Sequence, residues 1–174
     1  LVRAGYTEKA LRGTKSLINK PTKISNFGEF VELFGGPPST LFTITPPPKN
    51  TKPKAAGDDS PDPSVTSSDP ENYSLEIDTS TRYLLYDSLR LYFVNGGSDC
   101  YIVSVGSYDD KISAKDLNDI AVGGGIAALE KYTEPTILAI PEAILLSEAD
   151  CYSIQSAMLQ HCGFKMQNRF AILD

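Results

Sequence analysis

The sequence has few of the residue types that most often carry chemistry. Its 174 residues include one histidine, three cysteines and no tryptophan. The cysteines Cys100, Cys151 and Cys162 have no CxxC spacing. Such an odd, scattered set favours reduced, buried thiols over a disulfide framework, as in a protein made in the cytosol. Metal binding through cysteine and histidine is poorly supported as well.

The single histidine excludes most triad chemistry. A Ser-His-Asp triad would have to use His161, yet the chain has no GxSxG motif. His161 lies three residues after Met158, late in a helical pattern. We therefore expect a half-buried or capping histidine near a helix C-terminus, where a cation is favoured.

An excess of positive charge and long apolar runs are also lacking. Sixteen basic residues face 22 acidic ones, which gives a net charge of -6. This argues against sequence-independent binding of nucleic acid, because such binding needs clustered Lys and Arg. No apolar run approaches the roughly 18 residues of a membrane span, and the first residues lack the apolar region of a signal peptide. The chain has no initiator Met, and we expect a piece of a longer protein.

Proline is concentrated in one part of the chain. Nine of the twelve prolines lie in residues 37–70, and residues 46–72 contain only three apolar side chains. This composition predicts an extended, mobile surface excursion. Its apolar flanks, residues 41–44 and 73–77, are expected to pair as two strands. We predict an α/β core from residues 1–36 and 73–174, with residues 37–72 as a Pro-rich insertion.

The remaining pattern predicts an α/β fold with a small, mainly parallel sheet. Three short segments of the sequence are continuously apolar, and such runs are typical of strands that are covered on both faces. Helical segments separate them, as in βαβ units. The runs are residues 101–105, 136–140 and 170–173, and residues 1–5 form a further candidate strand.

Capping signals place the helices. Asn26 and Glu29 resemble a capping box, and Gly35 ends that helix. A helix over residues 81–94 is expected to be capped by Thr79 or Ser80 and to end at Asn95. Ser113 and Ser147 are expected to cap two further helices, the second ending at Gly163.

The sharpest enzymatic hypothesis comes from carboxylates that follow the predicted strands. Ligands of open parallel sheets bind at the carboxyl ends of the strands. Asp109 and Asp110 follow the first run, Glu142 follows the second and Asp174 ends the third. Such acids can converge on Mg²⁺, which prefers oxygen ligands. None has a Lys, Thr or phosphate motif at a diagnostic spacing, so we assign no catalytic, cofactor-binding or metal-binding residue.

Two further features favour structural roles. Gly123-Gly124-Gly125 precedes a helical segment, but it matches neither GxGxxG nor a P-loop. A break between two helices is favoured over a phosphate cradle. The helix after the insertion carries aromatic side chains on more than one face, and we expect burial within the domain rather than contact with another chain. These side chains are Tyr83, Tyr86, Tyr92 and Phe93.

An ordered set of sequence strings resembles the sheath proteins of contractile tails. This family covers contractile phage tails, R-type pyocins and extracellular contractile injection systems, and the chain looks closest to the injection-system type. The match covers nearly the whole chain except the Pro-rich excursion. The strings are GYTEKA (5–10), KPTKISNFGEFVELFGG (20–36), YLLYDSLRLYFVNGGSDCYIVSVGSY (83–108), GGGIAALEKYTEPTILAIPEA (123–143), QSAMLQHCG (155–163) and RFAILD (169–174).

The resemblance implies a structural, non-enzymatic role with no cofactor. Sheath subunits form hexameric rings that stack into a helical tube around an inner tube, and contraction drives the inner tube through a target membrane. The implied partners are neighbouring sheath subunits, the inner tube protein, and baseplate and terminal cap components, with no direct nucleic-acid contact. Terminal arms add strands to neighbouring sheets. The family's N-terminal arm and C-terminal parts have no counterpart in this sequence. The implied location is a particle assembled in the bacterial cytoplasm and released in some systems.

Overall fold

The computed structural model describes residues 1–46 and 73–173. Most of the predicted excursion (residues 47–72) and the candidate ligand Asp174 lie outside these residues. The chain groups into two units, one of Leu1–Ser39 with Tyr83–Asp174 and one of Thr40–Arg82. Residues 73–82, which we expected in the core, therefore belong with the insertion.

A five-stranded sheet forms the centre of the first unit. The strand order is β4-β7-β1-β8-β9. Neighbouring strands pair in parallel, except that β4 is antiparallel to β7. The mainly parallel α/β fold expected from the apolar runs is thereby confirmed. The strands are β1 (Val2–Thr7), β4 (Thr22–Ile24), β7 (Cys100–Ser107), β8 (Ile137–Ala139) and β9 (Phe170–Ile172).

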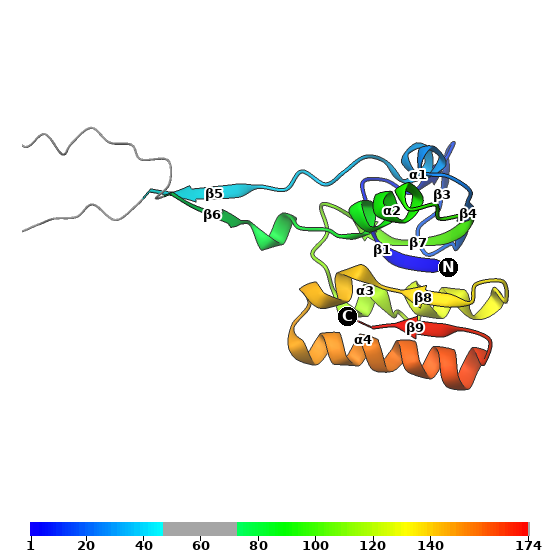
Figure 1. Ribbon diagram of the computed structural model, residues 1–174. Coiled ribbons are helices and arrows are strands. Elements are labelled where there is room, and N and C mark those ends of the chain that lie inside the picture. Colours follow the sequence, from blue (N-terminus) through cyan, green and yellow to red (C-terminus); the bar gives the residue numbers. More distant parts are fainter. Residues whose placement is uncertain (47–72, 174) are drawn as a thin grey trace, which may run out of the picture. The chain divides into compact units, whose positions relative to one another are not determined.

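Helices cover both faces of this sheet. Figure 1 shows α1 and α2 on one side and α3 and α4 on the other. Short helical turns and a small hairpin complete the unit. The elements are β2 (Leu11–Arg12), β3 (Lys15–Ser16), α1 (Phe27–Phe34), α2 (Leu85–Val94), α3 (Ala114–Leu117), the 3-10 helices η4 (Gly125–Lys131) and η5 (Pro141–Leu145), α4 (Glu148–Gln160) and the π-helix η6 (His161–Met166).

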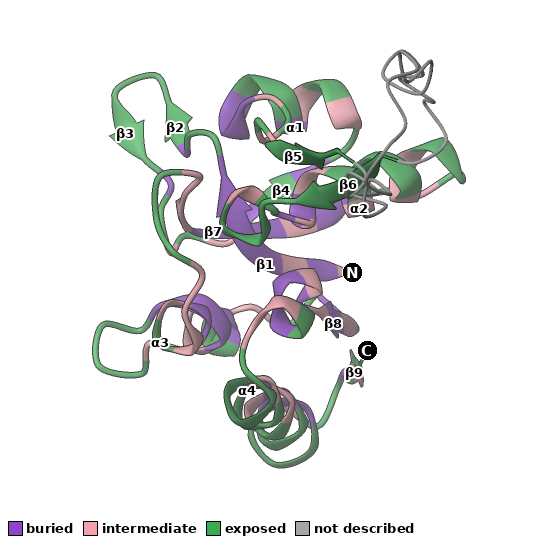
Figure 2. Cartoon of the chain, turned by 90° about the vertical axis from the view of Figure 1, so that its left-hand side faces the viewer, coloured by how far each residue is buried: buried purple, intermediate pink, exposed green. Residues whose placement is uncertain are grey.

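Each face of the sheet has its own apolar core. Phe30, Phe34 and Leu89 of the helices α1 and α2 pack with Ile102 of β7 in one cluster. The other cluster joins the rest of the sheet to α3, η4 and α4 and includes Leu117, Leu129, Ile154 and Met158. Figure 2 shows buried residues along the central strands. Double coverage explains why the strand sequences are continuously apolar rather than alternating.

Three predicted N-caps and the predicted glycine at the end of α1 are confirmed. The Asn26 side chain accepts a hydrogen bond from the Glu29 amide (2.9 Å), and Glu29 in turn accepts from the Ser25 amide. Gly35 follows α1 with φ of 92°, a left-handed value that favours glycine. The Ser113 side chain accepts a hydrogen bond from the Asp116 amide at the start of α3. The Ser147 side chain likewise accepts one from the Asp150 amide at the start of α4.

Two predicted helix boundaries are wrong. Thr79–Thr81 form a separate 3-10 turn, η3, capped by Asp78, and α2 starts only at Leu85 without a local side-chain cap. The α4 helix does not end at Gly163, because the chain continues as η6 until Gln167 takes a left-handed φ of 55°.

The second unit is a two-stranded hairpin, β5 (Phe42–Thr45) and β6 (Ser74–Ile77). Its strands pair antiparallel, as expected from the flanks of the excursion. Below the strands, the Asp78 amide donates to the Leu41 carbonyl and the Leu41 amide donates to the Thr81 hydroxyl, both at 2.9 Å. In the part of the chain that is described, no helix has the length and apolar character needed to cross a membrane.

Candidate functional site

Among the described residues, the predicted ligands Asp109, Asp110 and Glu142 do not belong to a group placed to hold a metal ion. Asp109 and Asp110 are exposed after β7, and Asp110 accepts hydrogen bonds from the amide (2.7 Å) and hydroxyl (3.1 Å) of Ser107. Glu142 is buried in η5 after β8. Within residues 1–46 and 73–173, no group of three or more His, Cys, Asp or Glu side chains is placed to hold a metal ion. Asp174 lies outside that range.

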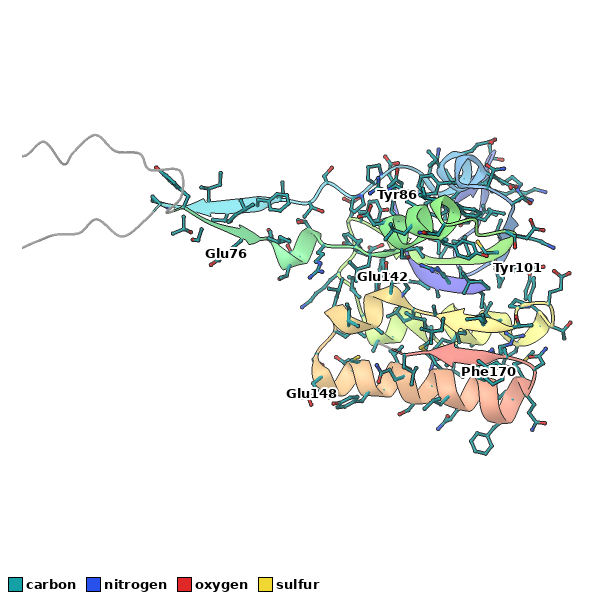
Figure 3. The ribbon with its side chains drawn as sticks, in the orientation of Figure 1. Glu76, Tyr86, Tyr101, Glu142, Glu148 and Phe170 are labelled. Atoms are coloured by element: carbon teal, nitrogen blue, oxygen red, sulfur yellow. The ribbon has the colours of Figure 1, made fainter. Side chains whose placement is uncertain are left out.

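Glu142 occupies the point where the chain direction across the sheet reverses. The chain runs from β1 to β7 on one side and then to β8 on the other side of β1, which is where open α/β sheets bind ligands. In this protein that point is filled by a side chain. Glu142 is fully buried, and its Oε1 accepts a hydrogen bond from the Leu85 amide at 2.9 Å. Figure 3 shows Glu142 at one end of the sheet, near β1.

Glycine at position 5 makes room for this carboxylate. A Cβ atom on Gly5 would lie 2.4 Å from Oε2 of Glu142, well inside van der Waals contact. The N-cap residue of α2 makes no side-chain capping bond, and the Glu142 carboxylate takes this role by accepting the hydrogen bond from the Leu85 amide. A carboxylate at a helix N-terminus satisfies free amides and interacts favourably with the helix dipole. One glutamate thus ties together β1, η5 and the start of α2.

Burial raises the pKa of Glu142 to about 7, although backbone amides of Leu85, Leu84 and Tyr6 favour the charged form. Oε2 has no hydrogen-bond partner among the described residues. A protonated carboxyl group loses less on burial than a charged one. Glu142 therefore changes its charge near neutral pH.

Three tyrosines lie beside this position. The rings of Tyr6 and Tyr83 have centroids 5.8 Å apart, and those of Tyr83 and Tyr108 are 4.8 Å apart. Tyr6 donates to Asp116 (3.0 Å), and the Tyr83 hydroxyl lies 2.7 Å from the Asp110 carbonyl. Burial raises the pKa of all three tyrosines. They therefore remain protonated at neutral pH and act as hydrogen-bond donors that hold the loop after β7.

His161 lies at the C-terminal end of α4, as expected, but its side chain is buried and a cation is not favoured there. His161 is buried, and burial together with the positive charge of Arg169 lowers its pKa to about 4. The Arg169 Nη1 lies 3.1 Å from Nε2 of His161. A guanidinium can only donate, so Nε2 accepts and the neutral ring carries its proton on Nδ1.

The glycine run lies between α3 and η4, as expected from a break between helices. Gly125 has φ of 58°, and a Cβ atom there would lie 2.0 Å from the Leu117 carbonyl oxygen. Its amide donates to the Asn19 side chain at 2.9 Å. This amide is thus already used within the protein and is not free to cradle a phosphate.

The aromatic helix is only partly buried. Tyr83 and Leu89 are buried, and Tyr86 packs on Phe27 with centroids 5.2 Å apart. Leu91 and Val94, by contrast, are 58% and 77% exposed. The three cysteines are free: Cys100 and Cys162 are buried and Cys151 is half-buried.

Comparison with known proteins adds no assignment. No protein-family model matches the chain, and no curated protein matches its sequence. The described residues form a mainly parallel sheet with helices on both faces, and a hairpin is inserted in the chain between α1 and α2.

Proposed function

We propose that this protein is a structural subunit of the sheath of a contractile tail or injection system. The observation that carries the proposal is that each of its two units exposes several large apolar side chains. Exposed apolar patches of this kind typically mark surfaces that bind other proteins. The resemblance of the sequence strings to contractile sheath proteins adds the particle type and the implied partners, namely neighbouring subunits and an inner tube.

The hairpin is the first such surface. Cross-strand partners share a face of a β-ribbon. The register pairs Phe42 with Ile77 and Ile44 with Leu75, whereas the opposite face carries Thr43, Thr45, Ser74 and Glu76. All eight residues are exposed (Figure 2). A two-stranded hairpin is marginally stable alone, so an apolar face of four large side chains favours a partner that covers it. We name these four residues the hairpin face.

The outer strand of the sheet is the second surface. β9 pairs only with β8 among the described strands, and Phe170 on it is 80% exposed (Figure 3). Phe164 is also 80% exposed, and Leu159 is 53% exposed. Side chains of this size are usually buried in an isolated domain. Their exposure supports a subunit that completes its packing in an assembly.

The test of this proposal is assembly measured by negative-stain electron microscopy, using the protein with its native termini. We expect rings or long hollow tubes. The double variant Ile44→Lys with Leu75→Lys places two charges on the hairpin face and is expected to reduce the tube yield about tenfold or more, because a buried unpaired charge is costly.

Thr43→Lys is the matched control, since it adds a charge to the polar face of the same hairpin and is expected to leave tubes intact. A native protein that stays monomeric under all assembly conditions and hydrolyses phosphoesters with Mg²⁺ would overturn the proposal. Equal loss of tubes in Thr43→Lys would show that the hairpin face is not the relevant surface.

A further inference from the structure

We propose that Arg169 forms a binding site for a carboxylate group, in the hollow beside β9. This site does not depend on the sheath proposal. Arg169 is 4% exposed, and arginine is almost never buried to this extent without a partner of opposite charge. None of the ion pairs among the described residues includes Arg169.

The guanidinium is held only by neutral groups. Nε donates to the Asn168 side chain at 3.1 Å, Nη1 donates to His161, and Nη2 donates to the Tyr132 carbonyl. These contacts use three of its five N–H donors and leave one on each terminal nitrogen. These hydrogen bonds fix the plane of the guanidinium group but do not neutralise its charge.

The acidic side chain that acts on the neighbouring His161 already has a basic partner. Glu130, whose charge acts on His161, is paired with Lys165. His161 cannot supply negative charge, and its neutral state avoids a second cation beside the arginine. A buried guanidinium in such surroundings binds an anion strongly, because charge-assisted bonds gain strength where water is excluded.

A hollow of about 720 Å³ lies beside β9, and Arg169 is among the residues that line it. That volume is within the range of small-ligand sites. Its lining includes Arg169, Asn168 and Gln167 as polar groups and Leu159, Phe170 and Cys162 as apolar ones. Gln167 follows η6 in a left-handed conformation, and Asn168 and Arg169 then lead into β9, which starts at Phe170. The mixed lining fits a carboxylate on an apolar stem better than a bare inorganic anion.

The site is tested by titrating the protein with hexanoate and, separately, with hexanamide, which has the same shape without charge. The readout is the NMR shift of the Arg169 Nε–H and of the Phe170 and Ala171 amides. We expect saturable shifts with hexanoate and none with hexanamide. Equal responses to both compounds, or no response to either, would overturn the proposal.

Two variants separate this site from general attraction by positive charge. Arg169→Lys keeps the charge but loses the fork and is expected to weaken hexanoate binding about tenfold or more. Lys131→Gln removes an exposed cation from the end of η4 that forms none of the ion pairs among the described residues, and is expected to change binding less than about twofold, because exposed charges are screened. Comparable weakening in both variants would refute a specific role for Arg169.

The carboxylate has two possible sources, and sedimentation tells them apart. If it belongs to a second copy of the chain, hexanoate competes and dissociates the oligomers. If it belongs to a separate molecule, hexanoate binds without changing the oligomeric state. Both results support the carboxylate site, whereas binding that persists unchanged in Arg169→Lys contradicts it.

Discussion

Replacement of Gly5 by alanine is expected to destabilise the protein by about 3 kcal/mol. The new Cβ atom would lie 2.4 Å from Oε2 of Glu142. Glu142 is fully buried, so its carboxylate cannot swing into water, and any movement also strains the bond to the Leu85 amide. Denaturant unfolding followed by circular dichroism measures the loss.

A double-mutant cycle assigns this cost to the contact with Glu142. In a Glu142→Ala background the carboxylate is gone, and Gly5→Ala is then expected to cost less than about 1 kcal/mol, which gives a coupling energy of about 2 kcal/mol. Gly163→Ala is the matched control, because no atom lies within 4 Å of its added Cβ. A Gly5→Ala penalty that is the same in both backgrounds would contradict the close contact.

The second large effect is the pH dependence that Glu142 imposes on stability. The folded carboxyl group has a pKa of about 7, against an ordinary value of 4.5 for a glutamate in water. Between these values the folded state binds more protons than the unfolded state. The stability that Glu142 contributes is therefore fully present below pH 4.5 and is lost as the pH rises through 7, by about 3 kcal/mol.

Glu142→Gln removes this titration while it keeps the size of the side chain and the acceptor for the Leu85 amide. We expect the free energy of unfolding of the variant, relative to the wild type, to rise by about 3 kcal/mol between pH 4.5 and pH 7.5. Urea unfolding at a series of pH values measures this difference. A difference that stays constant over the whole range would contradict a titrating, buried carboxyl group.

His161 changes the free energy of unfolding with pH in the direction opposite to Glu142. Its pKa falls from 6.5 to about 4 on folding. The stability it contributes is present above pH 6.5 and is lost as the pH falls through 4. In the wild type, the two contributions oppose each other between about pH 4.5 and 6.5. His161→Gln should therefore expose the Glu142 dependence, and Glu142→Gln should expose that of His161.

Local patterns predicted most of the fold. The three apolar runs became β7, β8 and β9, and the caps at Asn26, Ser113 and Ser147 formed as expected. These features depend on neighbours within a few residues. The start of α2 was missed because its cap is Glu142, which is 57 residues away in the sequence. No short-range rule identifies a cap from so distant an element.

The buried charges were missed for a similar reason. A glycine inside an apolar strand, such as Gly5, signals the close approach of another group, but it does not say which group. Arg169 precedes an apolar run and has the pattern of an exposed strand boundary, yet it is 4% exposed. The role of Gly5 is seen only when β1 lies beside η5, which carries Glu142. The burial of Arg169 is seen only when the chain before β9 lies beside His161 of η6.

The most direct measurement concerns Glu142, which the structure places as a buried cap at the start of α2. The ¹³C shift of its side-chain carboxyl group, followed by NMR over a pH titration, reports its protonation. We predict a midpoint at about pH 7 that is the same with and without millimolar Mg²⁺. A midpoint near the ordinary glutamate pKa of 4.5, or one that falls when Mg²⁺ is added, would contradict this assignment and favour the metal-dependent alternative.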